Sequence, residues 1–204
     1  MARTTRTTDT DPTEKDRRSA TQWLWVVATL AGIWALSPLV STLISLATGD
    51  HVTLPLSPPE TLPRPGDVEY QSLHASVPAD AIGDSAATFL GWGTALQALA
   101  VLVMLVVVTM VGNSMRPGRT LAGRRAIVLA VVAVAASAVG LVGTNLVAVA
   151  GTDACEQLYG ACVRNDGWND PLARVFQVTG LALAGLIALV RSETRARTAT
   201  EGLV

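Results

Sequence analysis

Between Ala126 and Ala150 the chain reads AIVLAVVAVAASAVGLVGTNLVAVA, a run without Asp, Glu, Lys, Arg or His. As a helix it would be about 37 Å long, enough to cross a hydrocarbon core about 30 Å thick. Three other stretches meet the same requirement, and the last of them carries one charge, Arg174, in its first turn. They are Trp23–Ala47, Ala86–Gly112 and Leu172–Val190. The sequence therefore predicts an all-α, four-helix transmembrane bundle.

Composition argues against several classes of function. The 204 residues are 50% hydrophobic and 15% charged, whereas a soluble domain carries about 25% charged residues. Too few charges remain to cover a water-facing surface, which disfavours a soluble enzyme, a nucleic-acid-binding domain and a disordered chain. A very apolar soluble bundle is the alternative, but its buried helices would seldom run this long without charge. We expect the chain to have the lipid bilayer as a partner and not to bind nucleic acid.

Basic residues are divided unequally between the two sides of the predicted bundle. Both tails and the segment 113–125 hold twelve of the fifteen Lys and Arg residues. Lys and Arg are retained on the cytoplasmic side, and an even number of spans places both termini on one side. Ten of the sixteen acidic residues lie on the opposite side. This pattern predicts a multi-pass protein of the plasma (inner) membrane with both termini in the cytoplasm.

The tails, residues 1–22 and 191–204, are polar. Residues 1–22 have too few apolar residues to fold, so we predict that they are disordered. Residues 191–204 are similar in composition, and the same interpretation applies to them. A basic tail before an apolar run also resembles a secretory signal, but this run of 25 residues exceeds the roughly 7–15 of a signal sequence. We expect the first span to be retained.

The longest predicted loop, residues 48–85, contains six of the ten prolines. His51–Leu56 and Val68–Val77 have strand character, and Pro63–Gly66 between them indicates a turn. We expect a small β-hairpin lying over the helices on the outer face. Two interpretations stay open: a cap that contacts a ligand or partner, and a rigid proline-stiffened connector. Loops of this length are uncommon unless they are functional or disordered.

The second predicted outer loop, residues 151–171, contains the two cysteines of the chain, Cys155 and Cys162. Thiols on the outer side of the membrane tend to pair, so we predict a structural disulfide. The alternative is a redox-active pair, as in four-helix membrane thiol oxidases. Such a relay needs a second cysteine pair, and residues 48–85 contain no cysteine. A zinc site would need two further ligands.

Ionisable side chains are absent from the middle of all four predicted spans. Ion transport, haem ligation and metal-dependent hydrolysis need such residues at membrane depth. We therefore expect no enzymatic activity, no cofactor and no metal. Three uncharged polar residues remain within the spans, Gln97, Asn145 and Gln177. Asn145 and Gln177 are expected to meet about 8 Å inside the outer boundary, either as a hydrogen bond between helices or as part of a polar pocket.

Small residues recur at four-residue spacing in the last three spans, a pattern that lets helix backbones approach closely. The pairs are Gly91 with Ala95, Ala133 with Ser137, Ala136 with Gly140, and Gly180 with Ala184. They predict helix packing within the bundle, and a homo-oligomer would use the same pattern.

A basic turn joins the second and third spans: NSMRPGRTLAGRR over residues 113–125, with Arg116, Arg119, Arg124 and Arg125. In this turn and in its span arrangement the chain resembles small four-helix bacterial membrane proteins of unknown function that have a large first outer loop. In one such family an aromatic residue stands three positions after a glycine of the turn, and Leu121 takes that place after Gly118 here. The resemblance implies a partnership with small cytoplasmic regulators. The arginines themselves predict contact with anionic lipid or a cytoplasmic protein.

Three hypotheses of function follow. The first is a non-enzymatic accessory or sensory membrane protein whose outer loops contact a ligand or a protein partner. The second is a small transporter or channel for an uncharged solute, with Gln97, Asn145 and Gln177 along its path. The third, which we favour least, is a thiol oxidoreductase that uses Cys155 and Cys162.

Overall fold

The computed structural model describes residues 12–56, 73–114, 123–160, 162 and 171–201. The four predicted helices are confirmed, and each is long and apolar enough to cross a membrane. Their bounds are α1 Pro12–Thr48, α2 Gly83–Ser114, α3 Gly123–Tyr159 and α4 Pro171–Glu201. Two strands, β1 His51–Leu56 and β2 Leu73–Pro78, and a short 3-10 turn, η1 Ala79–Ala81, lie between α1 and α2.

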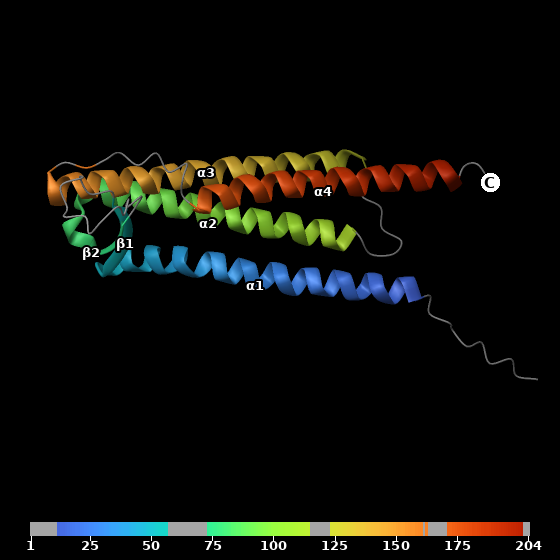
Figure 1. Ribbon diagram of the computed structural model, residues 1–204, viewed down its shortest axis with the longest axis horizontal. Coiled ribbons are helices and arrows are strands. Elements are labelled where there is room, and N and C mark those ends of the chain that lie inside the picture. Colours follow the sequence, from blue (N-terminus) through green and yellow to red (C-terminus); the bar gives the residue numbers. More distant parts are fainter. Residues whose placement is uncertain (1–11, 57–72, 115–122, 161, 163–170, 202–204) are drawn as a thin grey trace, which may run out of the picture.

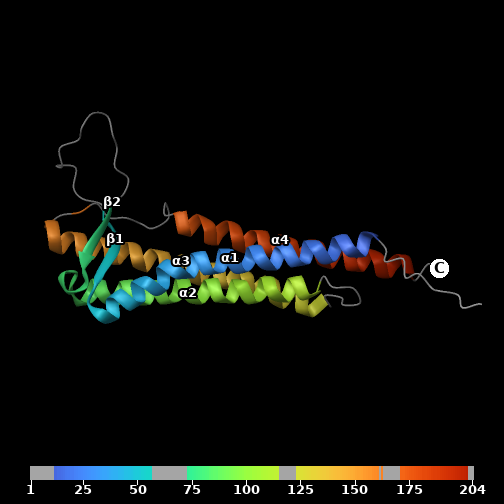
Figure 2. The same cartoon turned by 90° about the horizontal axis from the view of Figure 1, so that it is seen from below.

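The helices lie side by side along one long axis (Figures 1 and 2). Helix α3 packs against both α2 and α4, whereas α1 packs mainly against α2 and β1. The strands lie at one end, which we call the hairpin end (Figure 1). Helix α1 begins and α4 ends at the opposite end, which we call the tail end (Figure 1). Both tails therefore leave the bundle at the same end, as four spans require.

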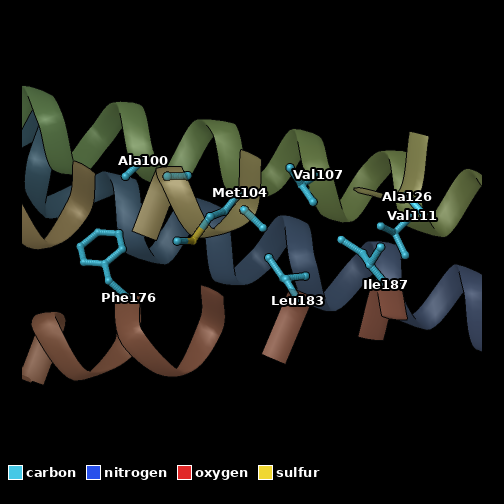
Figure 3. Packing of buried hydrophobic residues seen from close by; sticks show 10 residues of the cluster. Ala100, Met104, Val107, Val111, Ala126, Phe176, Leu183 and Ile187 are labelled. Atoms are coloured by element: carbon cyan, nitrogen blue, oxygen red, sulfur yellow. The ribbon is translucent and has the colours of Figure 1, made fainter. Parts of the chain in front are cut away.

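The helical core is formed by α2, α3 and α4. Figure 3 shows Phe176, Leu183 and Ile187 projecting from α4 toward the side chains of α2. The buried cluster consists of Ala100, Met104, Val107, Val111, Ala126, Ala133, Ala136, Phe176, Leu183 and Ile187. Lipid is as apolar as these side chains, so close packing rather than escape from water holds this part of the bundle together.

Glycine sets how closely α2 and α3 approach. A Cβ added at Gly93 would lie 2.8 Å from the Gly143 carbonyl oxygen, and one added at Gly143 would lie 2.7 Å from the Gly93 carbonyl oxygen. The two backbones thus touch directly, as small residues permit in membrane helices. The sequence pattern pointed to Gly91, which instead has only the Leu46 side chain nearby, at 4.0 Å.

The small-residue pairs on α3 and α4 are confirmed as packing positions. The Ser137 hydroxyl is buried and donates a hydrogen bond to the Phe176 carbonyl across the α3–α4 interface. Gly180 lies directly against the Ser137 side chain, and Gly140 lies against the ring of Phe176.

All four helices extend beyond the predicted spans, and three of them do so by nine residues or more. Helix α1 begins at Pro12, so residues 12–22, predicted to be disordered, are helical. Helix α4 continues to Glu201, through most of the segment predicted as a tail. Helix α3 continues to Tyr159, nine residues into the predicted loop 151–171. The apolar spans supply the costly nucleus of each helix, and adding polar residues to an existing helix costs little.

Glycines at positive φ end α1 and α3. Gly49 has φ 76°, and the Asp50 amide after it donates to the Ser45 carbonyl at 3.0 Å. Gly160 has φ 77°, and its amide donates to the Glu156 carbonyl at 2.8 Å. Both are standard glycine C-caps, and the first turns the chain directly from α1 into β1.

Candidate functional site

The predicted hairpin forms, and it is ordered over its two strands. Strands β1 and β2 pair antiparallel from His51 opposite Pro78 to Leu56 opposite Leu73. The first strand has the predicted bounds, and the second is described over Leu73–Pro78, one residue beyond the predicted end at Val77. The turn predicted at Pro63–Gly66 and the start of the predicted second strand lie outside the described residues. We call residues 51–56 and 73–82 the hairpin cap.

One face of the hairpin cap is packed into the ends of α2 and α3. Val52 is 1% exposed, Leu54 0% and Val77 7%. They share a buried cluster with Ile82 of the cap and with residues of the two helices: Ala86, Leu90, Ala150, Ala154 and Cys155. Val52 pairs with Val77 across the strands, so these side chains point to the same face of the hairpin. The hairpin therefore has its own apolar core.

Two glycines allow the cap to contact the helices closely. The Pro55 carbonyl lies so near Gly151 of α3 that a side chain there would displace it. Gly83 begins α2 with φ 70°, and the side-chain amide of Gln157 occupies the place of its missing Cβ. The edge of β1 is thereby fixed against α3, and the start of α2 against the end of α3.

The opposite face of the hairpin is polar and open except at Pro55, which is buried. His51, Thr53, His74 and Ser76 alternate with the buried residues and are exposed. Thr53 lies directly opposite Ser76, which places two hydroxyls side by side on this face. Beside it, the Thr48 hydroxyl donates to the Asp50 carboxylate at 2.7 Å. The cap thus presents polar side chains, two hydroxyls and two imidazoles among them, on a fixed backbone.

The predicted disulfide between Cys155 and Cys162 is present. Cys155 is fully buried in the cluster below the hairpin, and Cys162 is partly buried. The bond joins Cys162, after the end of α3, to Cys155 of α3 below the cap, and it thereby fixes the chain that leaves α3. Thiol exchange requires an accessible sulfur, and the burial of Cys155 makes it a poor target.

The intramembrane polar residues are arranged differently from the prediction. Gln97 is 3% exposed, and its Nε2 donates to the Thr144 hydroxyl, 3.1 Å away on α3. The Thr144 hydroxyl in turn donates to the Gly140 carbonyl at 3.0 Å. This pair lies at the close α2–α3 approach, where Gln97 also contacts Gly143. Sequence reasoning missed Thr144 because a threonine can satisfy its hydroxyl within its own helix.

The predicted meeting of Asn145 and Gln177 is not seen. Asn145 Nδ2 donates instead to the Leu141 carbonyl of its own helix at 2.9 Å. Among the described side chains no hydrogen bond joins Asn145 to Gln177. Asn145 directly follows Thr144, so its side chain lies about a quarter of a turn around α3 from that of Thr144. It is Thr144 that forms the hydrogen bond to α2. Among the described residues, the three predicted polar side chains are thus not joined to one another by hydrogen bonds.

The predicted basic turn is described only in part. Arg116 and Arg119 lie outside the described residues. Arg124 and Arg125 belong to the first turn of α3 and are exposed at the tail end. Within the described part of the chain, no three His, Cys, Asp or Glu residues are grouped so that they could hold a metal ion.

Comparison with protein-family models, with curated proteins and with solved structures finds no match to this chain.

Proposed function

We propose that this chain is a non-enzymatic accessory or sensory protein of the plasma membrane, with both termini in the cytoplasm. Its hairpin cap faces outward and contacts a ligand or a protein partner. One observation carries the proposal: the hairpin buries one face in its own apolar core and leaves the other polar face open. A simple connector between α1 and α2 needs no such core.

The unequal charge distribution supports this orientation. Arg124 and Arg125 lie at the tail end, opposite the hairpin, and the sequences of both tails are also rich in arginine. Retention of basic residues in the cytoplasm then places the hairpin cap outside. The disulfide at the hairpin end agrees with an oxidising compartment.

Cysteine labelling tests the orientation. Thr53→Cys adds an exposed thiol on the cap, and Ser192→Cys adds one at the tail end. Because Cys155 and Cys162 are joined, the new thiol is the reactive one in each variant. A membrane-impermeant maleimide should label Thr53→Cys in intact cells and Ser192→Cys only after permeabilisation. The reverse pattern would overturn the proposed orientation.

Photocrosslinking tests the contact surface. A photoreactive phenylalanine analogue replaces Thr53 or Ser76, which are opposite each other on the open face. Leu181, 72% exposed on α4, is the control position. We expect the two cap positions to give an adduct of the same mass in native membranes, because both side chains face the same space outside the hairpin. Absence of any adduct beyond the control, or unrelated adducts at the two positions, would contradict the proposal.

A further inference from the structure

A cavity of about 460 Å³ lies between α3 and α4 near the tail end. Four of the residues that line it are alanines: Ala126 and Ala130 on α3, Ala184 and Ala188 on α4. Small side chains in facing stripes of the two helices leave space where larger residues would have closed the interface. Its volume is within the range of about 300–1,000 Å³ that is typical of ligand sites.

The cavity is apolar except at one end. Arg191 and Ser192 are the polar side chains among its lining residues, and Arg191 is the first charged residue after the apolar run of α4. Arg191 is partly buried, with its Nε atom enclosed. Ser192 is exposed. The boundary of the hydrocarbon core therefore falls at this end of the cavity, where an arginine side chain reaches the headgroup region.

Further positive charge lies next to the cavity on the other helix. Arg124 and Arg125 directly precede the lining residue Ala126 and are exposed. Basic pockets between membrane helices, at the level of the headgroups, favour anionic lipids. A guanidinium can bind a lipid phosphate with two parallel hydrogen bonds. A zwitterionic headgroup carries the same phosphate, but its own cation cancels the charge, so the arginine attracts an anionic headgroup more strongly.

The lining of the cavity leads along α4 from apolar residues to a charged end. From Ala184 to Ser192 it extends over eight residues of α4, or about 12 Å, so an apolar chain can lie along the alanines while a charged headgroup reaches Arg191. We infer that this cavity binds an anionic glycerophospholipid, with one acyl chain between the alanine stripes and the phosphate at Arg191.

This inference does not depend on the proposed role of the hairpin cap. Only the leaflet from which the lipid comes depends on the proposed orientation. The test below does not involve the cap, so failure of either proposal leaves the other standing.

Native mass spectrometry of the full chain tests lipid binding. The protein is released from mixed micelles containing equal amounts of phosphatidylglycerol and phosphatidylcholine. We expect one retained lipid with a preference for phosphatidylglycerol of about tenfold, because an arginine at the headgroup level attracts a lipid with net negative charge by about 1 kcal/mol. Arg191→Gln should reduce this preference to near one, and Arg191→Lys should keep most of it. Equal retention of the two lipids by the unmodified chain would overturn the inference.

Two matched variants test the position of the acyl chain. Ala184→Trp fills the cavity, whereas Ala182→Trp adds the same bulk on the exposed side of the same helix. We expect retention to fall at least about tenfold in the first variant and to stay unchanged in the second. Equal loss in both would overturn the site. If Ala184→Trp does not give a monodisperse protein, Ala188→Trp, at an exposed lining position, replaces it.

Two further measurements test which arginine matters and whether the bound phosphate must belong to a lipid. Arg174→Gln removes an exposed arginine at the opposite end of α4 and should leave the lipid preference unchanged. Glycerol 3-phosphate offers the headgroup chemistry without an acyl chain and should not displace the retained lipid. Displacement by millimolar glycerol 3-phosphate would show a site for soluble phosphate compounds and overturn the lipid assignment.

Discussion

Gly93→Ala should destabilise the bundle by about 2–3 kcal/mol, near the upper part of the range for overpacked interiors. The added methyl would lie 2.8 Å from the Gly143 carbonyl oxygen and 2.9 Å from the Val147 side chain. A change of rotamer cannot relieve a contact with backbone, so α2 and α3 must move apart. That movement also lengthens the hydrogen bond between Gln97 and Thr144, which lies at the same crossing.

Gly91→Ala is the matched control. It makes the same chemical change two residues away on α2, where the nearest atom is a Leu46 methyl at 4.0 Å. Because alanine has a higher helix propensity than glycine, this variant should be neutral or slightly more stable. Equilibrium unfolding in mixed micelles with increasing SDS measures both. A loss of about 3 kcal/mol corresponds to an unfolding constant roughly a hundredfold larger. Equal stability of the two variants would refute the tight crossing.

The contrast between Gly91 and Gly93 also shows how far the sequence pattern extends. Four-residue spacing of small residues identified real contacts on α3 and α4, where Ser137 meets Gly180. On α2 it selected Gly91, because Gly91 and Ala95 match the spacing, and it passed over Gly93. Spacing defines a face of a helix, but the neighbour of that face depends on the rotation of every helix in the bundle.

Polar residues within the spans were recognised, but not their partners. Gln97 was predicted to lie along a solute path with Asn145 and Gln177 in one hypothesis, whereas its partner Thr144 resembles any threonine in an apolar helix. Asn145, one residue later, has the stronger hydrogen-bonding group and yet bonds within α3. Hydropathy likewise located the membrane crossings, but it could not show that α3 continues to Tyr159. Helix ends depend on local caps such as Gly160, which follows Tyr159 at positive φ.

The hairpin was predictable because its signals are local. Alternation in His51–Leu56 and the clustered prolines after it define a strand and its end without knowledge of the helices. What the alternation could not provide is the surface on which the strand packs. The sequence does not show that the Pro55 carbonyl packs against Gly151, since a glycine after an apolar span is equally typical of a helix end.

Leu54→Ala should loosen the hairpin cap by about 2–5 kcal/mol, the range for removing a fully buried leucine side chain. Leu54 is 0% exposed and contacts the cluster formed by the ends of α2 and α3. The cap lies outside the predicted spans, so water drives its packing, whereas lipid removes that driving force within the bundle. We therefore expect a local effect, with the cap opening more often while the helices remain folded.

Hydrogen exchange of the backbone amides separates the cap from the helices. Amides of β1 and β2 should exchange at least about 30-fold faster in Leu54→Ala, the equivalent of about 2 kcal/mol, while amides in the middle of α2 and α3 keep their rates. Thr53→Ala, at the adjacent exposed position, should change neither. Equal acceleration across the cap and the helices would mean that they unfold together and that the cap is not a separate unit. Unchanged exchange in the strands would mean that Leu54 does not anchor the hairpin, and the fixed outer surface on which the proposed function depends would be lost.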